Sequence, residues 1–191
     1  MSTIVVVRKG RQACMAADSL TTYGEVRQPA AYERGHDKIH RFAGNSIGIV
    51  GSAAHQLVIE SLLTDTCEYR FDSRKAIFDS FRELHQVLKD KYYLNPKDED
   101  DDPYESSRID ALLMNRHGLF GVCALREVFE YTRFWAIGAG AEFALGAMHA
   151  LYDRLDSAEA IARAAIEAGA EFNTATALPM TCECIELEGD N

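Results

Sequence analysis

Two hydroxyl side chains stand at the start of the chain, Ser2 and Thr3, and they lead directly into the apolar run Ile4 to Val7. A hydroxyl is a poor nucleophile at neutral pH and needs a base beside it before it can attack a substrate. Chain termini usually fray, so hydroxyl residues that enter a strand at once need a reason. An ordered terminus that carries a hydroxyl is therefore the first candidate for chemistry.

The thiol side chains form a weaker candidate. The five cysteines are an odd number without CxxC spacing, and they are Cys14, Cys67, Cys123, Cys182 and Cys184. This pattern is typical of reduced thiols and not of a disulfide framework. Cys182 and Cys184 would face the same side of a strand, and we interpret them as small buried side chains and not as a metal site.

An acidic segment bounded by prolines, NPKDEDDDPYESS at 95–107, has no hydrophobic period. We interpret it as a solvated loop inserted into the domain. It does not match the D-x-D-x-D-G pattern of a calcium loop, so we predict no metal site in it. No cofactor is predicted for the chain.

The composition describes one acidic domain over residues 1–191, with 47% hydrophobic residues that can form a substantial core. Its formal net charge of -10 argues against a nucleic-acid partner and against binding to an acidic membrane surface. No apolar run has the length of a signal-peptide core or of a membrane span. Together with the reduced cysteines, these features predict a soluble cytoplasmic protein.

Strands dominate the first fifty residues, where β-branched and alternating apolar residues are frequent. We expect strands at 3–8, 12–18 and 21–26, and a hairpin over 39–51 with Gly44-Asn45 at its tip. Apolar residues at helical spacing then predict two helices, with stripes at Val58, Leu62 and Leu63 and at Ile77, Phe78, Phe81, Leu84 and Leu88.

The second half repeats this order. We expect strands at 109–115, 119–125, 127–131 and 134–138, helices at 141–155 and 157–169, and a last strand at 181–187. Ser157 and Gly169 are the expected first cap and stop of the last helix. Runs of strands separated by helix pairs predict an α+β fold, a four-layer α-β-β-α sandwich of two antiparallel sheets.

Several segments together resemble the proteasome β-subunit family of N-terminal-nucleophile (Ntn) hydrolases, above all its HslV type and the proteasome homologue of betaproteobacteria. The segments that carry the resemblance are STIV at 2–5, AADSLTT at 16–22, DKI at 37–39, GSAA at 51–54, AIGAGAEFALGA at 136–147 and SAEAIARAAI at 157–166. They span nearly the whole chain and imply the Ntn form of the sandwich.

The register of this resemblance separates the two terminal hydroxyls. In HslV the nucleophile precedes the Asp of the second strand by sixteen residues, and Ser2 precedes Asp18 by the same interval, whereas Thr3 is one residue too close. The resemblance therefore implies that Ser2 is the nucleophile, a serine in place of the family's usual threonine. Lys38 matches the family's active-site lysine, although four extra residues lie in the connection before it.

The implied roles agree with the chemistry of these side chains. After removal of Met1, the α-amino group of Ser2 would be the base, because a reference pKa near 8 leaves it partly neutral at pH 7. Lys38 would supply a positive charge that favours the neutral amine, and Asp18 would be its ion-pair partner. By resemblance, the backbone N–H of Gly51 would donate to the oxyanion.

The resemblance also implies where a substrate would bind. Thr22 would bind the substrate backbone as an added strand. Thr21, Ile49 and Ala53 would line the side-chain pocket, and their small or branched apolar character predicts a preference for a medium-sized apolar side chain.

Two positions depart from the family pattern. Ala139 stands where the family usually has the serine of G-S-G. Glu171, with Thr174, aligns with the Asp of the family's D-x-x-S/T pattern and is one methylene longer. Because these groups orient the amine, the changes concern the rate and the hydrogen-bond network more than the type of reaction.

The resemblance implies a self-compartmentalising peptidase that hydrolyses unfolded polypeptides through an acyl-enzyme on Ser2. It implies a homo-oligomer of stacked six- or seven-fold rings whose active sites face an inner chamber, and an ATP-dependent unfoldase ring as a further partner. Two alternatives stay open, an Ntn amidase that acts on small amides and a non-catalytic ring protein that keeps the fold.

Overall fold

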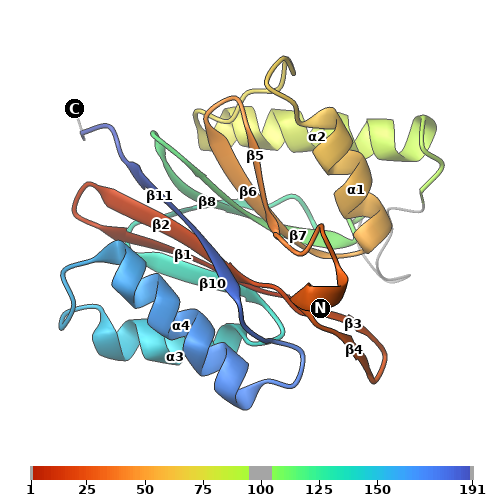
Figure 1. Ribbon diagram of the computed structural model, residues 1–191. Coiled ribbons are helices and arrows are strands. Elements are labelled where there is room, and N and C mark those ends of the chain that lie inside the picture. Colours follow the sequence, from red (N-terminus) through yellow and green to blue (C-terminus); the bar gives the residue numbers. More distant parts are fainter. Residues whose placement is uncertain (1, 95–104, 190–191) are drawn as a thin grey trace.

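The computed structural model describes residues 2–94 and 105–189, and Figure 1 shows their arrangement. Two antiparallel sheets lie face to face, and each is covered on its outer face by a pair of helices. This confirms the predicted α-β-β-α sandwich. Of the acidic loop expected at 95–107, only the last three residues are described, and Ser106 and Ser107 are buried instead of solvated.

The first sheet contains the N-terminal strand. Its strands, in spatial order, are β10 (Phe134–Gly138), β1 (Thr3–Lys9), β2 (Gln12–Asp18) and β11 (Met180–Glu186). The helices α3 (Ala141–Leu151) and α4 (Ala158–Phe172) pack on its outer face. The first and last strands of the described chain therefore lie in one sheet, while the two termini lie at opposite ends of it (Figure 1).

The second sheet consists of five strands. In spatial order they are β5 (Ile39–Phe42), β6 (Asn45–Gly51), β7 (Ile109–Asn115), β8 (Gly118–Val122) and β9 (Val128–Tyr131). The helices α1 (Ala53–Leu62) and α2 (Arg74–Asp90) cover it. A small hairpin of β3 (Thr21–Tyr23) and β4 (Val26–Gln28) and a 3₁₀ turn at Ala30–Tyr32 connect β2 to β5.

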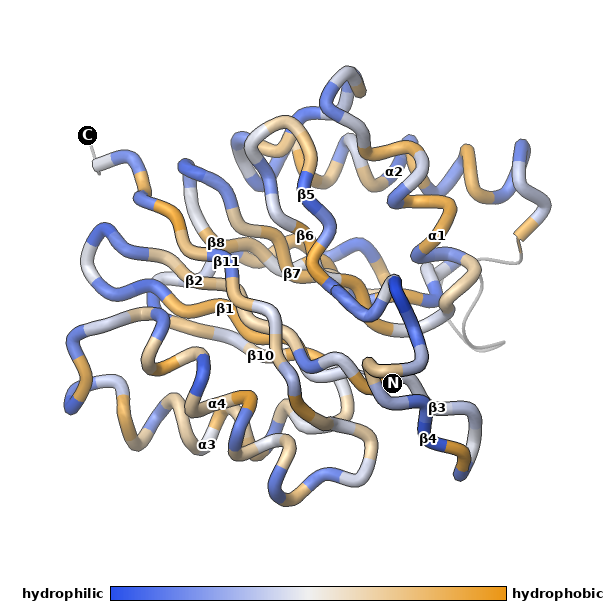
Figure 2. The backbone as a smooth tube through the Cα atoms, viewed as in Figure 1, coloured by the Kyte–Doolittle hydropathy of each residue, from blue (hydrophilic) through white to orange (hydrophobic). Residues whose placement is uncertain are grey.

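The strand β1 is buried on both faces, which explains its unbroken apolar run. Ile4 and Val6 pack between the two sheets, while Val5 and Val7 pack against α3 and α4. All four are 0% exposed. Figure 2 shows the same apolar colouring along the inner strands. Since side chains alternate along a strand, only a sequence that is apolar at every position can occupy this place.

The hairpin between β5 and β6 turns one residue earlier than expected. Phe42 pairs with Asn45, so the two loop residues are Ala43 and Gly44, not Gly44 and Asn45. Both have a positive φ, 44° and 75°, as a two-residue turn of this kind requires. A hydrogen bond of 2.6 Å from the Ala43 N–H to the Asp65 carboxylate supports the unfavourable alanine conformation.

The helix α4 does not stop at Gly169, as predicted, but continues to Phe172. Gly169 is buried, and a Cβ there would lie 3.5 Å from the methyl groups of Thr3 and Thr176. These are ordinary van der Waals distances, so Gly169 is a buried position within α4, packed against Thr3, and does not end the helix.

Candidate active site

The backbone of Ser2 and Thr3 is fixed on both sides. The Ala139 N–H donates to the Ser2 carbonyl oxygen over 2.8 Å, and the Thr3 N–H donates to Asp18 Oδ1 over 2.8 Å. Ser2 is half-buried and Thr3 is 0% exposed. The terminus is therefore ordered from residue 2 onward, and Ser2 is the first described residue that a ligand can reach.

The hydroxyl of Thr3 is occupied by structural hydrogen bonds. The Gly140 N–H donates to it over 2.9 Å, and it shares a hydrogen bond of 2.6 Å with the Thr176 hydroxyl. Because Thr3 is buried and its oxygen is engaged, the structure leaves it no access to a substrate. Of the two terminal hydroxyls, only that of Ser2 remains a candidate for chemistry.

The buried carboxylate of Asp18 accepts hydrogen bonds from four groups of the site. Its Oδ1 accepts hydrogen bonds from Thr3 N–H and from the Lys38 ammonium, each over 2.8 Å. Its Oδ2 accepts from the N–H groups of Leu20 and Ala177, over 3.0 and 3.2 Å. A carboxylate that is 1% exposed needs such donors in place of water. Asp18 thus connects the N-terminal strand, the lysine and the segment after α4.

Lys38 lies beside this carboxylate, at the start of β5. Its side chain is 9% exposed and donates to Asp18 and to the Leu20 carbonyl oxygen, the latter over 2.7 Å. Burial lowers the pKa of the Lys38 ammonium from its ordinary 10.5, while the negative charge of Asp18 opposes this change. The structure therefore brings Lys38 and the backbone of Thr3, the residue after Ser2, to the carboxylate of Asp18.

Two glycines allow the loop before α3 to lie against the terminus. A Cβ at Gly138, where φ is 94°, would lie 1.9 Å from the Ser2 carbonyl oxygen. A Cβ at Gly140 would lie 2.6 Å from the Thr3 hydroxyl and 2.9 Å from that of Thr176. The G-A-G sequence is thus needed for close approach, and Ala139 contributes its backbone N–H although it lacks the hydroxyl of the family's serine.

In the segment after α4, the hydrogen bonds to the loop before α3 and to Thr3 come from residues two positions beyond those predicted. Glu171 and Thr174 are exposed, and neither takes part in the hydrogen bonds around Asp18. Asn173 donates to the Ala139 carbonyl oxygen over 2.8 Å, and Thr176 contacts the Thr3 hydroxyl. Glu171 is still in the last turn of α4, whereas Asn173 ends the helix, so its side chain can turn back toward the terminus.

The oxyanion donor predicted at Gly51 lies at the end of β6. Its φ is 119°, and a Cβ there would lie 2.1 Å from the Arg108 carbonyl oxygen. Only glycine fits this position, so its backbone is held close to β7. The following Ser52 occupies the N-cap of α1 without a side-chain hydrogen bond to the helix.

The predicted substrate residues are not all on the surface. Thr22 lines a pocket of about 270 Å³ to which Thr174 also contributes, and the neighbouring Thr21 is half-buried and donates to Glu33 over 3.2 Å. Ala53 is exposed at the first turn of α1. Ile49 is 2% exposed and packs in the core between the second sheet and its helices. The structure therefore corrects the placement of Ile49, which belongs to this core.

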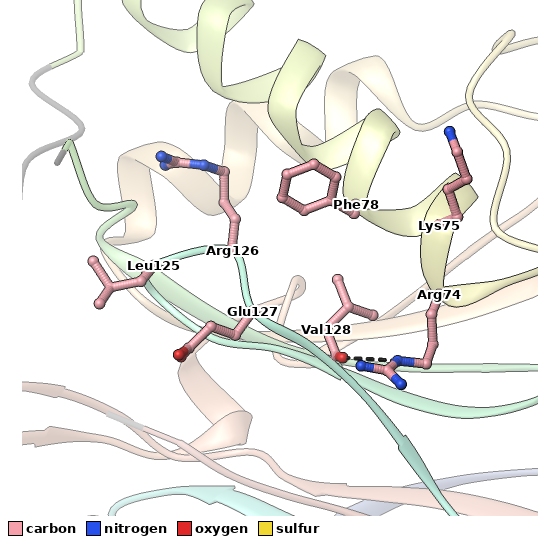
Figure 3. Close-up of a pocket in the computed structure, with 7 residues that line it drawn as sticks. All are labelled: Arg74, Lys75, Phe78, Leu125, Arg126, Glu127 and Val128. Carbon is pink, nitrogen blue, oxygen red and sulfur yellow. Dashed lines mark hydrogen bonds between the residues drawn. The ribbon is translucent and has the colours of Figure 1, made fainter.

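A larger pocket lies elsewhere, between α2 and the loop before β9, and shares no residue with this site. It has a volume of about 400 Å³ and is lined by Arg74, Lys75, Phe78, Leu125, Arg126, Glu127 and Val128, as Figure 3 shows. Phe78, expected in the apolar stripe of α2, lines this pocket and is 45% exposed. The polar side chains of the pocket are largely engaged, since Arg74 donates to the Val128 carbonyl oxygen and Lys75 pairs with Asp79.

Among the described residues, no helix has the length and apolar character needed to cross a bilayer. Over the same part of the chain, no cluster of His, Cys, Asp and Glu side chains is arranged to hold a metal ion.

Comparison with known structures places this arrangement in a family. The structure of Thiobacillus denitrificans BPH, a bacterial proteasome homologue, superimposes with a TM-score of 0.90 at 39% sequence identity. The match covers 98% of this chain and 100% of that one. The chain belongs to the proteasome β-subunit family. This confirms the resemblance seen in the sequence.

Two further solved structures match this chain, one at similar and one at lower sequence identity. BPH of the same organism in complex with epoxomicin matches with a TM-score of 0.89 at 37% identity, over 98% of this chain and 100% of that one. Eukaryotic HslV from Trypanosoma brucei shares the fold, with a TM-score of 0.68 at 21% identity, over 96% of this chain and 99% of that one. No protein-family model matches the chain.

Sequence reasoning missed Asn173 and Thr176, which hold the loop before α3 and the terminus. The signal that could have found them is a second polar-x-x-Thr spacing at 173–176, which overlaps the first one at 171–174. A sequence alone does not distinguish the two registers, because the difference depends on where α4 ends.

Proposed function

We propose that the protein is an Ntn peptidase in which Ser2 attacks the substrate carbonyl and forms an acyl-enzyme. The observation that carries this proposal is the shared contact at Asp18 Oδ1, which binds the Thr3 N–H and the Lys38 ammonium together. It holds the residue that follows Ser2 beside a buried positive charge. Support comes from the epoxomicin complex of the related BPH.

In the proposed mechanism, the free α-amino group of Ser2 takes the proton of its own hydroxyl during the attack. The positive charge of Lys38 favours the neutral form of that amine and stabilises the developing alkoxide. The Gly51 N–H donates to the oxyanion, and the amine then returns the proton to the leaving group. Water hydrolyses the ester to Ser2 and restores the enzyme.

The proposed substrates are unfolded polypeptides, bound as a strand along β3 with Thr21 and Thr22 at the contact and Ala53 near the side-chain pocket. A peptidase of low specificity must be closed off from folded proteins, so we propose a homo-oligomer of stacked rings in the cytoplasm. An ATP-driven unfoldase ring would then deliver the substrates. Each of these points extends the family relationship and needs its own test.

The test begins with the intact mass of the purified protein, because a retained Met1 would block the Ser2 amine. Material without Met1 is expected to cleave an unstructured peptide panel and to gain the mass of a β-lactone or epoxomicin on Ser2. Ser2→Ala is expected to lose both properties, and Ser2→Thr is expected to keep them. Tandem mass spectrometry of the labelled terminal peptide locates the modified residue.

The matched control is Thr3→Ser, which keeps the structural hydroxyl and should retain activity. Unchanged peptide hydrolysis by the Ser2→Ala variant would overturn the mechanism. Cleavage of small amides without peptides would favour the Ntn amidase. A processed terminus that reacts with neither probe nor peptide would favour the non-catalytic ring protein.

A further inference from the structure

Three of the cysteines meet on the outer face of the first sheet, far from Ser2. Cys14 on β2 is the direct cross-strand partner of Cys184 on β11, and their sulfur atoms are 3.0 Å apart. Cys182, two residues earlier on the same face of β11, pairs with Ala16, which is two positions after Cys14 on β2. The sequence predicted Cys182 and Cys184 on one face of a strand as small buried side chains, whereas Cys184 is exposed and stands opposite Cys14.

The three thiols differ in accessibility. Cys14 is 0% exposed, Cys182 is partly buried under α4, and Cys184 is exposed. Cys184 also lines a pocket of about 320 Å³ at the start of α4, together with Ser157 and Glu159. A small molecule can therefore reach Cys184 from solvent, and Cys184 in turn touches a thiol that solvent does not reach.

The backbone geometry permits a bond between the two. Directly opposed residues of antiparallel strands have Cα atoms roughly 4.5–5.5 Å apart, within the span of about 4.4–6.8 Å that disulfides require. Cys14 and Cys184 need no movement of either strand to be joined. Cys123, half-buried in the loop after β8 on the other sheet, has no cysteine opposite it in the β8–β9 pairing.

We propose that Cys14 and Cys184 are a redox-active dithiol, which an oxidant of the peroxide class converts into a disulfide between β2 and β11. The Cys184 sulfur attacks one peroxide oxygen; an S–O bond forms, the O–O bond breaks, and the leaving hydroxide takes the Cys184 proton as water. The Cys14 sulfur then attacks the Cys184 sulfur; the S–S bond forms, the S–O bond breaks, and hydroxide leaves with the Cys14 proton as a second water. Two thiols are oxidised and one peroxide is reduced.

Cys182 is a positioning residue in this proposal. It lies two residues from Cys184 on the same face of β11 and packs against the same core as Cys14, so it helps to hold the Cys14 side chain beside Cys184. The Cys14 proton passes directly to the leaving hydroxide, and the disulfide joins the two neighbours of Cys182.

The disulfide would fasten the edge strand β11 to the centre of the sheet. β11 begins at Met180, which pairs with Asp18, and the segment before it carries the Ala177 N–H that donates to Asp18. Oxidation thus restrains the strand that follows the Asn173–Ala177 segment. Reduction by small thiols reverses the bond, as expected of a transient disulfide in a reducing compartment.

The test treats the full-length protein with hydrogen peroxide, followed by alkylation, intact mass and non-reducing peptide mapping. The expected result is a loss of two hydrogen atoms, a linked peptide pair containing Cys14 and Cys184, and full reversal by dithiothreitol. Hydrogen exchange of the β11 amides should become roughly tenfold slower in the oxidised form, because local opening of an edge strand is restricted.

Three variants decide the assignment. Cys123→Ser should form the disulfide as the parent does, Cys182→Ser should form it more slowly, and Cys184→Ser should not form it. A Cys184→Ser variant that still loses two hydrogen atoms, or a parent disulfide joining any other pair, would overturn the proposal. Equal rates for Cys182→Ser and the parent would remove the role of Cys182. Since the readout is a mass and not hydrolysis, the outcome is independent of the proposed peptidase activity.

Discussion

At the scale of single residues, the site depends on a buried ion pair. The Asp18 side chain is 0% exposed and that of Lys38 is 9% exposed, with 2.8 Å between the charged atoms. Removing two charges from water costs several kcal/mol per ion, which their attraction and the additional hydrogen bonds offset. The pair is therefore poor evidence for added stability, but loss of one partner leaves the other charge buried and uncompensated.

Asp18→Asn should consequently destabilise the fold by about 3–5 kcal/mol, because it removes the counter-charge of Lys38 while it keeps the side-chain volume. The matched control is Asp37→Asn, which removes an exposed ion pair to Arg41 whose side chains are 39% and 42% exposed. That change should cost no more than about 1 kcal/mol. Urea unfolding at equal protein concentration measures both. Similar midpoints for the two variants would contradict the account of Asp18.

The lowered pKa of Lys38 predicts the alkaline side of the activity profile. Because burial lowers the pKa of this cation below 10.5, its charge is lost at a lower pH than that of an exposed lysine. Hydrolysis should therefore decline before pH 10.5 is reached. The same shift means that the unfolded chain binds more protons between the two pKa values, so this group favours folding increasingly as the pH rises there.

A pH profile of single-turnover acylation measures this decline. Lys75→Met, which removes a lysine whose side chain is 87% exposed, is the control and should leave the profile unchanged. Acylation that stays constant to pH 10.5 would show that the charge of Lys38 is not required.

At the scale of elements, the terminus is held by contacts from three directions. β1 begins at Thr3, directly after Ser2, the loop before α3 contributes the Ala139 and Gly140 N–H groups, and the segment after α4 contributes Thr176. Asn173 joins the last two of these by its hydrogen bond to the Ala139 carbonyl oxygen. The position of Ser2 thus depends on where α4 ends and turns.

Asn173→Ala should reduce the acylation rate of Ser2 by about tenfold to a hundredfold, because misplacement of a nucleophile by about 1 Å has an effect of this size. Glu171→Gln, a change at the exposed position two residues earlier, should have no effect on that rate. Labelling by a β-lactone probe over time compares the two variants with the parent. The reverse order of effects would restore Glu171 as the residue that orients the amine.

At the scale of the whole molecule, apolar side chains remain on the outer helices. Phe143 on α3 and Phe172 at the end of α4 are 41% and 68% exposed, and their ring centroids lie 5.7 Å apart. Large exposed apolar patches mark protein contacts, and we propose that this aromatic pair belongs to such a contact. It lies on the helix layer, where a further copy of the chain could pack in the proposed ring assembly.

Sedimentation should accordingly give a mass that is a multiple of 21.3 kDa. Phe172→Ser should weaken the assembly, because it removes apolar area from the proposed contact. Tyr32→Ser, at a position in the 3₁₀ turn that is 81% exposed, serves as the control and should leave the mass unchanged. A monomeric parent protein would exclude the compartment.

Much of the fold could be predicted because it depends on local pattern. The unbroken apolar run of β1, the alternating strands and the stripe of α2 each follow from which faces are buried. The predictions that failed depend on contacts between distant segments. Gly169 resembles a helix stop, but α4 continues past it and packs it against Thr3, and the hairpin tip at Ala43 is held by Asp65 from beyond α1.

The sequence by itself predicted the order of elements, because the pattern of each element is a local property, and the resemblance carried by its motifs predicted the family and Ser2 as the candidate nucleophile. Only the tertiary structure decided that Asn173 and Thr176, not Glu171 and Thr174, face the terminus, since this depends on how α4 packs on β1. It likewise decided that Cys14 meets Cys184, 170 positions away in the chain. The register between β2 and β11 is set by the hydrophobic faces of the whole sheet, which no single segment encodes.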